Sequence, residues 1–196
     1  PFNTEEQPIE KDRYRLLWTA LCPYAHRAVI ARKLLGLDKV ISLGTLDYRR
    51  GVDGLQFSLD PDGVDPILKK PTLKSVYNYS EPNYEGPYSV PAFVDLKTEK
   101  IVRKESAEIL HEFATVFKPL HKEGAIDLYP ESLANQIDEW NEKLAIAVND
   151  GVYRMGFAKT QDEYDLAFNR FFDVLDEVEE RLSNQRYING NSITET

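Results

Sequence analysis

The sequence predicts a fold of two parts, an α/β half followed by a half built only of helices. Residues 14–46 carry a strand–helix–strand pattern: a short apolar run, a stretch with helical spacing and a β-rich stretch follow one another. A second pair of strand patterns, separated by a turn, comes at 89–103. From residue 130 onward, apolar residues recur only at helical spacing. We therefore expect a mixed sheet with helices first, and helices alone afterwards.

The first strand leads into the first helix through a cysteine and a proline. Residues 16–18 (Leu-Leu-Trp) are typical of a short buried strand, and 19–21 make a brief connection. Cys22 stands immediately before Pro23, and proline is well tolerated in the first turn of a helix because its missing N–H would have no partner there. Gly36 is placed as the C-terminal stop of a helix whose apolar positions are Ala25, Val29, Ile30 and Leu34.

Cys22 is the only cysteine of the chain, and the pattern places it at a helix N-terminus. Free N–H groups and the helix dipole stabilise a thiolate there, and His26 and Arg27 lie one turn on. The alternative is a buried structural cysteine. Ala25 occupies the place of the second cysteine of a dithiol motif, so Cys22 has no resolving partner in the chain. Any redox cycle must therefore use an external small-molecule thiol.

The middle of the first half is less regular. Residues 40–46 predict a strand parallel to the first one, because the connection between them is helical. Residues 47–88 carry five prolines and are expected to form a long irregular insertion. Near its end the insertion gathers four tyrosines, which serve either a functional site or the packing of the loop: Tyr77, Tyr79, Tyr84 and Tyr88.

The remaining elements follow in order. Residues 89–95 and 100–103 predict an antiparallel hairpin, with Pro91 at the start of its first strand, and Glu105-Ser106 open a helix. Two amphipathic helices follow, at 133–148 and after Thr160, which forms a capping box with Glu163. A second capping box at 192–195 predicts a further helix beyond the sequence, so the helical half is expected to be incomplete.

Composition and charge argue against several classes of function. The 196 residues are 42% hydrophobic and 29% charged, which is typical of a globular protein of one or two domains. A formal net charge of −9 without a basic stripe argues against nucleic acids and anionic membranes as partners. No apolar run approaches the ~20 residues of a membrane span and no signal peptide is visible, so we expect a cytoplasmic protein. The three histidines lack ligand spacing, so no metal site is expected.

Four stretches carry a family resemblance: 22–27 (Cys-Pro-Tyr-Ala-His-Arg), 90–95 (Val-Pro-Ala-Phe-Val-Asp), 105–109 (Glu-Ser-Ala-Glu-Ile) and 151–164 (Gly-Val-Tyr-Arg-Met-Gly-Phe-Ala-Lys-Thr-Gln-Asp-Glu-Tyr). Over nearly its whole length the chain resembles a glutathione transferase of the Xi class, the glutathionyl-hydroquinone reductases. The first two stretches also suit the omega class, whereas the tyrosine-bearing insertion and the Gly-Val-Tyr stretch single out Xi.

The resemblance implies a domain order. Residues 1–116 would form a thioredoxin-like, thiol-binding domain that carries the insertion 47–88. Residues 117–129 would be a linker, and residues 130–196 a truncated helical domain of the glutathione-transferase type.

The resemblance also implies roles in binding glutathione as a co-substrate. Cys22 would be the nucleophile. Val90, before a Pro91 expected to be cis, would pair its backbone with the cysteinyl part of glutathione. Glu105 and Ser106 would hold the γ-glutamyl end, with Ser106 at a helix N-terminus, where a carboxylate is favoured.

On the substrate side, Tyr24 and Tyr153 would face an aromatic, quinone-derived conjugate. The implied reaction is the reduction of glutathionyl-hydroquinones through a mixed disulfide at Cys22, in a homodimeric enzyme without metal. Two alternatives remain open. One is an omega-like thioltransferase or dehydroascorbate reductase, and the other is a non-catalytic binding protein that keeps the fold.

Four positions depart from the family pattern. Leu55 stands where a glutathione-contacting Trp is usual, and Pro87 stands where an Arg is usual. Lys104 replaces an Asn, and Tyr24 replaces the Trp of the Cys-Pro-Trp form. Losing the Arg and the Trp favours the non-catalytic alternative, whereas Lys104 or Arg103 is a candidate replacement charge.

Overall fold

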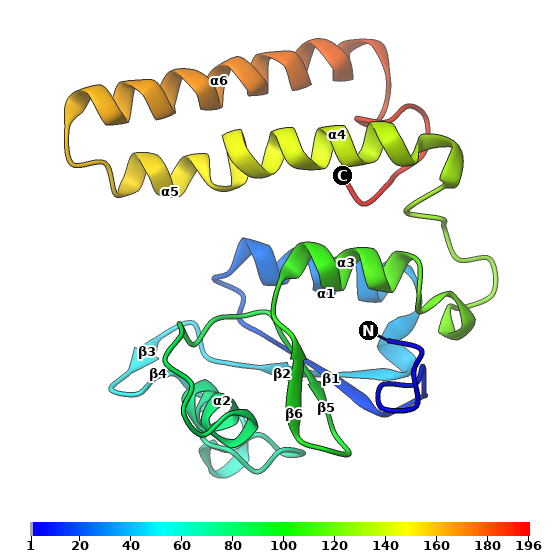
Figure 1. Cartoon of the computed structure of the whole chain (residues 1–196), viewed down its shortest axis with the longest axis vertical. Coiled ribbons are helices and arrows are strands. Elements are labelled where there is room, and N and C mark those ends of the chain that lie inside the picture. Colours follow the sequence, from blue (N-terminus) through cyan, green and yellow to red (C-terminus); the bar gives the residue numbers. More distant parts are fainter. Residues whose placement is uncertain (1) are drawn as a thin grey trace. The chain divides into compact units, whose positions relative to one another are not determined.

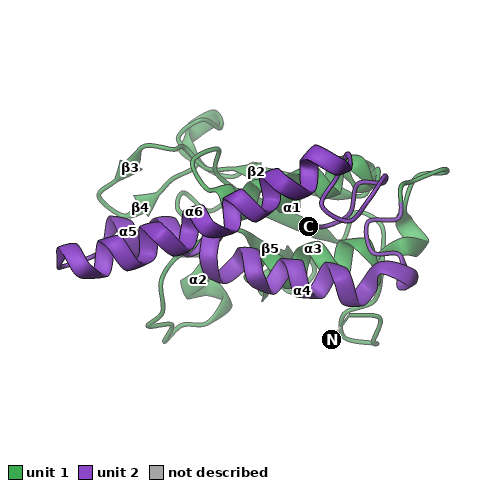
Figure 2. Cartoon of the chain, turned by 90° about the horizontal axis from the view of Figure 1, so that it is seen from above, with its two compact units in different colours: residues 1–126 green, residues 127–196 purple. Residues whose placement is uncertain are grey.

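The computed structural model describes residues 2–196 of the chain. It divides into two compact units, unit 1 (Pro1–Ile126) and unit 2 (Asp127–Thr196), which Figure 2 colours separately. The boundary between the two units lies within the stretch 117–129 that was expected to be a linker. Phe117, expected in the linker, is fully buried in unit 1.

Unit 1 is built on a mixed four-stranded sheet in the order β2-β1-β5-β6 (Figure 1). β1 and β2 are parallel, whereas β1 with β5 and β5 with β6 are antiparallel. The predicted strand–helix–strand unit and hairpin are thus confirmed. The elements of this framework are β1 (Tyr14–Trp18), α1 (Pro23–Leu34), β2 (Ile41–Thr45), β5 (Ala92–Asp95), β6 (Lys100–Arg103) and α3 (Ser106–Ala114).

The core of unit 1 lies around the central strands. Three β1 side chains, Tyr14, Leu16 and Leu17, have no exposed surface, as expected for a strand covered on both faces. Burial of each such apolar side chain stabilises the fold by about 1.5–3 kcal/mol. Aromatic rings pack against Tyr14 and one another at centroid distances of 5.1 to 5.9 Å: Phe2, Phe93, Phe113 and Phe117. Helices α1 and α3 lie side by side on the sheet (Figure 1).

The insertion at 47–88 is more regular than expected. It contains a small hairpin of β3 (Arg50–Gly51) and β4 (Gly54–Leu55), and a helix, α2 (Leu73–Ser80). The expectation of an irregular insertion was therefore wrong for α2. Thr72 and Ser75 form a reciprocal capping box, in which Ser75 takes the place of the usual Glu or Gln. Eight residues between prolines gave too short a pattern to be recognised.

Unit 2 consists of helices. The helix predicted at 133–148 is α4 (Ala134–Leu144) continued by a π-helix (Ala145–Asn149), and α5 (Gly151–Gly156) follows. α6 (Gln161–Asn184) returns alongside α5 (Figure 1). Thr160 Oγ1 accepts the Glu163 N–H at 3.2 Å, which confirms it as the N-cap.

The last residues of unit 2 are not helical. Glu195 donates its N–H to the Leu128 carbonyl at 2.8 Å, and Asn189 Nδ2 donates to Thr194 Oγ1 at 2.9 Å. The capping-box pattern at 192–195 therefore starts no helix within residues 2–196. Across the same residues, every helix is too short or too polar to cross a lipid bilayer.

Candidate active site

Cys22 is the N-cap of α1, as predicted. Its backbone is extended (φ −93°, ψ 110°), Pro23 follows in the first turn, and the Ala25 N–H points at Cys22 Sγ from 3.4 Å. Cys22 is half-buried, so the alternative of a wholly enclosed structural cysteine does not describe it. The sulfur therefore lies at the N-terminal end of a helix, on a residue that is not fully enclosed.

The loop before β5 brings Val90 to the same sulfur. The Val90–Pro91 peptide bond is cis, as expected, and the Cys22 thiol donates to the Val90 carbonyl at 3.3 Å. These residues are 68 positions apart in sequence. The sheet order brings them together. β1 and β5 are antiparallel neighbours, so the end of β1, which leads to Cys22, lies beside the start of β5, which follows Val90.

Glu105 and Ser106 begin α3. Glu105 is the N-cap residue, and its side chain makes no capping hydrogen bond. Ser106 is only 6% exposed, and its hydroxyl accepts hydrogen bonds from Arg27 Nε at 3.0 Å and from Arg27 Nη2 at 2.6 Å. Arg27 lies on α1 beyond Cys22, so the starts of α1 and α3 are tied together. The sequence placed Arg27 near Cys22 but gave no sign of its bond to Ser106.

The two tyrosines predicted to face an aromatic substrate lie in different units. Tyr24, in the first turn of α1, is half-buried, with the Arg27 guanidinium 5.7 Å from its ring centre. Tyr153 on α5 is 43% exposed and stacks on Phe157 at 6.5 Å. The role of Tyr153 toward Cys22 stays a prediction.

Known proteins are similar to nearly the whole chain, although no family profile matches it. Glutathione S-transferase omega-like 2 of Schizosaccharomyces pombe is 38% identical over 95% of this chain and 62% of its own length. The glutathionyl-hydroquinone reductase YqjG of Escherichia coli is 39% identical over 95% of this chain and 57% of its own. Its glutathione-bound structure matches with a TM-score of 0.88 over 95% of this chain and 61% of that chain.

The structure of the Xi glutathione transferase of Phanerochaete chrysosporium is decisive. It matches with a TM-score of 0.92 at 38% identity, over 99% of this chain and 67% of that chain. The chain belongs to the Xi class of glutathione transferases. The family resemblance and the predicted fold, a thioredoxin-like half and a helical half, are thereby confirmed. The chain spans less than two thirds of the length of the curated relatives it matches.

The positions that depart from the usual Xi pattern have their own local partners. Leu55 is 7% exposed and belongs to the core cluster that also contains Leu17 and Val90. The Pro87 carbonyl accepts the Tyr84 hydroxyl at 3.1 Å.

Lys104 donates to the same Tyr84 oxygen at 3.3 Å and lies 5.2 Å from the ring centre. This hydrogen bond raises the pKa of Lys104, so its charge persists. Arg103, the other candidate replacement charge, pairs instead with Glu112 at 2.9 Å. Lys104 is therefore the cation beside Glu105.

Three of the four tyrosines near the end of the insertion form one cluster, which the sequence indicated only as a grouping. The ring centres of Tyr77, Tyr84 and Tyr88 lie 4.8 to 5.8 Å apart. Tyr77 donates its hydroxyl to the Ser89 carbonyl at 2.8 Å, directly before Val90, and burial raises the pKa of Tyr77. The cluster thus fixes the loop that reaches Cys22. Tyr79 points elsewhere, with the Lys70 ammonium 4.2 Å from its ring centre.

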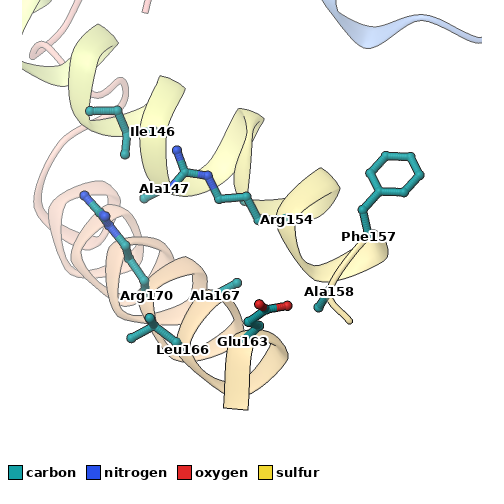
Figure 3. Close-up of a pocket in the computed structure, with 10 residues that line it drawn as sticks. Ile146, Ala147, Arg154, Phe157, Ala158, Glu163, Leu166, Ala167 and Arg170 are labelled. Carbon is teal, nitrogen blue, oxygen red and sulfur yellow. The ribbon is translucent and has the colours of Figure 1, made fainter. Parts of the chain in front are cut away.

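Unit 2 holds a separate hollow of about 400 Å³ between the π-helix, α5 and α6 (Figure 3). Its walls are largely apolar, with Arg154 and Arg170 reaching over it from opposite sides (Figure 3). None of the site residues predicted from the sequence lines it, although Tyr153 is the neighbour of Arg154.

Proposed function

We propose that this protein reduces glutathionyl-hydroquinones with glutathione, through Cys22. One observation carries the proposal: the only cysteine caps α1 with its sulfur 3.3 Å from the carbonyl before a cis-proline. The start of α1 turns the Ala25 N–H toward the sulfur, and the backbone of the Val90 loop lies beside it. The similarity to a glutathionyl-hydroquinone reductase and to a glutathione-bound structure supports the same assignment.

The chemistry would run in two displacement steps. In the first, the Cys22 thiolate attacks the sulfur of the conjugate. The bond from that sulfur to the ring carbon breaks, the carbon takes the electron pair and a proton, and free hydroquinone leaves. Cys22 is then in a disulfide with glutathione. In the second step, a glutathione thiolate attacks the glutathione sulfur of this disulfide, which releases oxidised glutathione and regenerates the Cys22 thiolate.

The other site residues would hold the two substrates. The Val90 backbone, beside Pro91, would pair with the cysteinyl part of glutathione, and Glu105 and Ser106 would hold its γ-glutamyl end. Tyr24 and Tyr153 would contact the aromatic ring. Lys104 beside Glu105 keeps a positive charge at a site that lacks the usual Arg.

A general thioltransferase or dehydroascorbate reductase is the second candidate, since the relative from Schizosaccharomyces pombe is named omega-like. The leaving group separates the two. A hydroquinone reductase requires an aromatic carbon as leaving group, whereas a thioltransferase acts on mixed disulfides in general. We also propose that the protein is a cytoplasmic homodimer. Light scattering of the full-length protein should then give the mass of two subunits.

The test is steady-state turnover of glutathionyl-menadiol with glutathione, followed by absorbance and compared with a mixed disulfide of glutathione and cysteine. The proposal predicts ping-pong kinetics, a clear preference for the aromatic conjugate and no turnover by Cys22→Ser. Lys33→Met on the outer face of α1 is the matched control and keeps wild-type rates. Equal rates on both substrates favour the thioltransferase. Turnover of neither, with no glutathione bound, favours the non-catalytic alternative.

A further inference from the structure

Arg27 restricts the Ser106 hydroxyl to one hydrogen-bonding role. A guanidinium has donors only, so the Ser106 oxygen must accept both of the Arg27 N–H groups that reach it, at 3.0 and 2.6 Å. A hydroxyl accepts at two lone-pair positions and donates one proton. With both positions used, the remaining capacity of Ser106 is to donate, and among residues 2–196 its proton has no acceptor.

Several hydrogen-bond donors lie around this proton. Ser106 is 6% exposed and is the first residue of α3, a helix of nine residues whose N-cap, Glu105, makes no side-chain capping bond. The N–H groups of the first turn of a helix have no partner within the helix. The start of α3 therefore brings together free backbone N–H groups, the Ser106 hydroxyl as a donor and the positive charge of Arg27.

The charges here are arranged for a zwitterion. Arg27 supplies a positive charge beside the donors, and Glu105 supplies a negative charge one residue before them. Glu108, also in the first turn of α3, is paired with Arg103 at 3.7 Å, which weakens its repulsion of an anion. An α-amino acid head group fits this pattern, with its carboxylate on the donors and its ammonium on Glu105.

We propose that Arg27 is a positioning residue for glutathione. By occupying both acceptor positions of Ser106, Arg27 fixes the hydroxyl as a donor to the α-carboxylate of the γ-glutamyl group. This inference rests on the proposed function, because it requires glutathione as the thiol. It also separates Arg27 from the chemistry at Cys22: Arg27 sets recognition of the thiol, and Cys22 carries the displacement.

The test measures, by titration calorimetry on the full-length protein, the Kd for glutathione and for decarboxylated glutathione (4-aminobutanoyl-cysteinylglycine). The wild type is expected to prefer glutathione by about 10- to 100-fold, the range of hydrogen bonds to a charged group. Arg27→Met and Ser106→Ala should each remove most of this preference while leaving the Kd for the decarboxylated thiol within about twofold. Because Arg27 acts through Ser106, the double variant should lose little more than either single variant.

Two further variants separate positioning from charge and from general damage. Arg27→Lys keeps the charge but cannot make two N–H bonds from one planar group, so it should restore only part of the preference. Lys33→Met removes a cation from the same helix at a 75% exposed position and should behave as wild type. Equal weakening of both thiols in Arg27→Met, or full recovery in Arg27→Lys, overturns the positioning role.

The wild type separates failure of this inference from failure of the proposed function. If it turns over the aromatic conjugate but binds both thiols equally, the Arg27 inference is wrong and the proposed function stands. If it neither binds glutathione nor turns over the conjugate, both are wrong. If Arg27→Met lowers the folded fraction, Ser106→Ala, which removes only one oxygen, still measures the preference for glutathione over the decarboxylated thiol.

Discussion

The buried ion pair between Arg15 and Asp65 ties the insertion to the central strand of unit 1, and it gives a sharp prediction. Arg15 on β1 donates to Asp65 Oδ2 from Nε at 3.0 Å and from Nη2 at 2.8 Å, and the two side chains are 4% and 0% exposed. Asp65 Oδ1 also accepts the N–H groups of Ile67 and Leu68. The variant Asp65→Asn keeps the shape and an oxygen for these two amides, but it removes the charge that faces Arg15.

The guanidinium of Arg15 is then buried without a counter-charge, a change that typically costs about 3–5 kcal/mol. Proteins have only about 5–15 kcal/mol of unfolding free energy, so the loss is a large share of the total. Urea unfolding should show a lower midpoint at an unchanged slope.

The matched control for this prediction is Lys33→Met. Lys33 pairs with Asp38 at 3.2 Å but is 75% exposed, and such surface pairs contribute about 0–1 kcal/mol. A loss of unfolding free energy below about 1 kcal/mol in Asp65→Asn would contradict a buried, uncompensated Arg15, because the guanidinium would then have reached another partner or solvent.

Three further predictions concern single side chains. Cys22→Ser should leave no mass adduct with glutathione and no hydroquinone release; an adduct elsewhere in the chain would contradict the nucleophile assignment. Tyr77→Phe removes the hydroxyl that donates to the Ser89 carbonyl, so it should lower the unfolding free energy in urea by about 0.5–1.5 kcal/mol and raise the KM for glutathione. An unchanged KM would contradict a role of the tyrosine cluster in positioning the Val90 loop. Burial raises the pKa of Tyr14 to about 12 from 10.0, so the folded state keeps a proton that the unfolded state loses. The unfolding free energy should therefore fall between pH 10 and 12 by up to about 1.4 kcal/mol per pH unit. Tyr14→Phe should fall less steeply with pH, and an equal slope would contradict this origin.

The parts of the fold that local chemistry determines could be predicted from the sequence. Cys22 before Pro23 marked the start of α1 because both the cap and the proline act within one turn. The Thr160 cap of α6 was visible for the same reason. α2 was not predicted because its capping box uses Ser75 and its eight residues offer only about two turns of periodicity.

Contacts between distant residues leave no local pattern in the sequence, and for Cys22 and Val90 only the family resemblance implied a shared site. The bond from Arg27 to Ser106 spans 79 positions, and the bond from Cys22 to Val90 spans 68. No local pattern carries such contacts, since they follow from the order of strands in the sheet. Leu55 shows the same limit: the sequence marked it as a missing ligand contact, whereas tertiary packing makes it a core residue.

Single-turnover chemistry tests whether Cys22 carries out the displacement. The full-length protein, reduced and freed of glutathione, is mixed with excess glutathionyl-menadiol. Released hydroquinone and the intact protein mass are then followed together. We expect release to stop at one hydroquinone per Cys22, matched by one glutathione added to the protein, until free glutathione restarts turnover. Release without a Cys22 adduct, or continued release without free glutathione, would contradict this expectation.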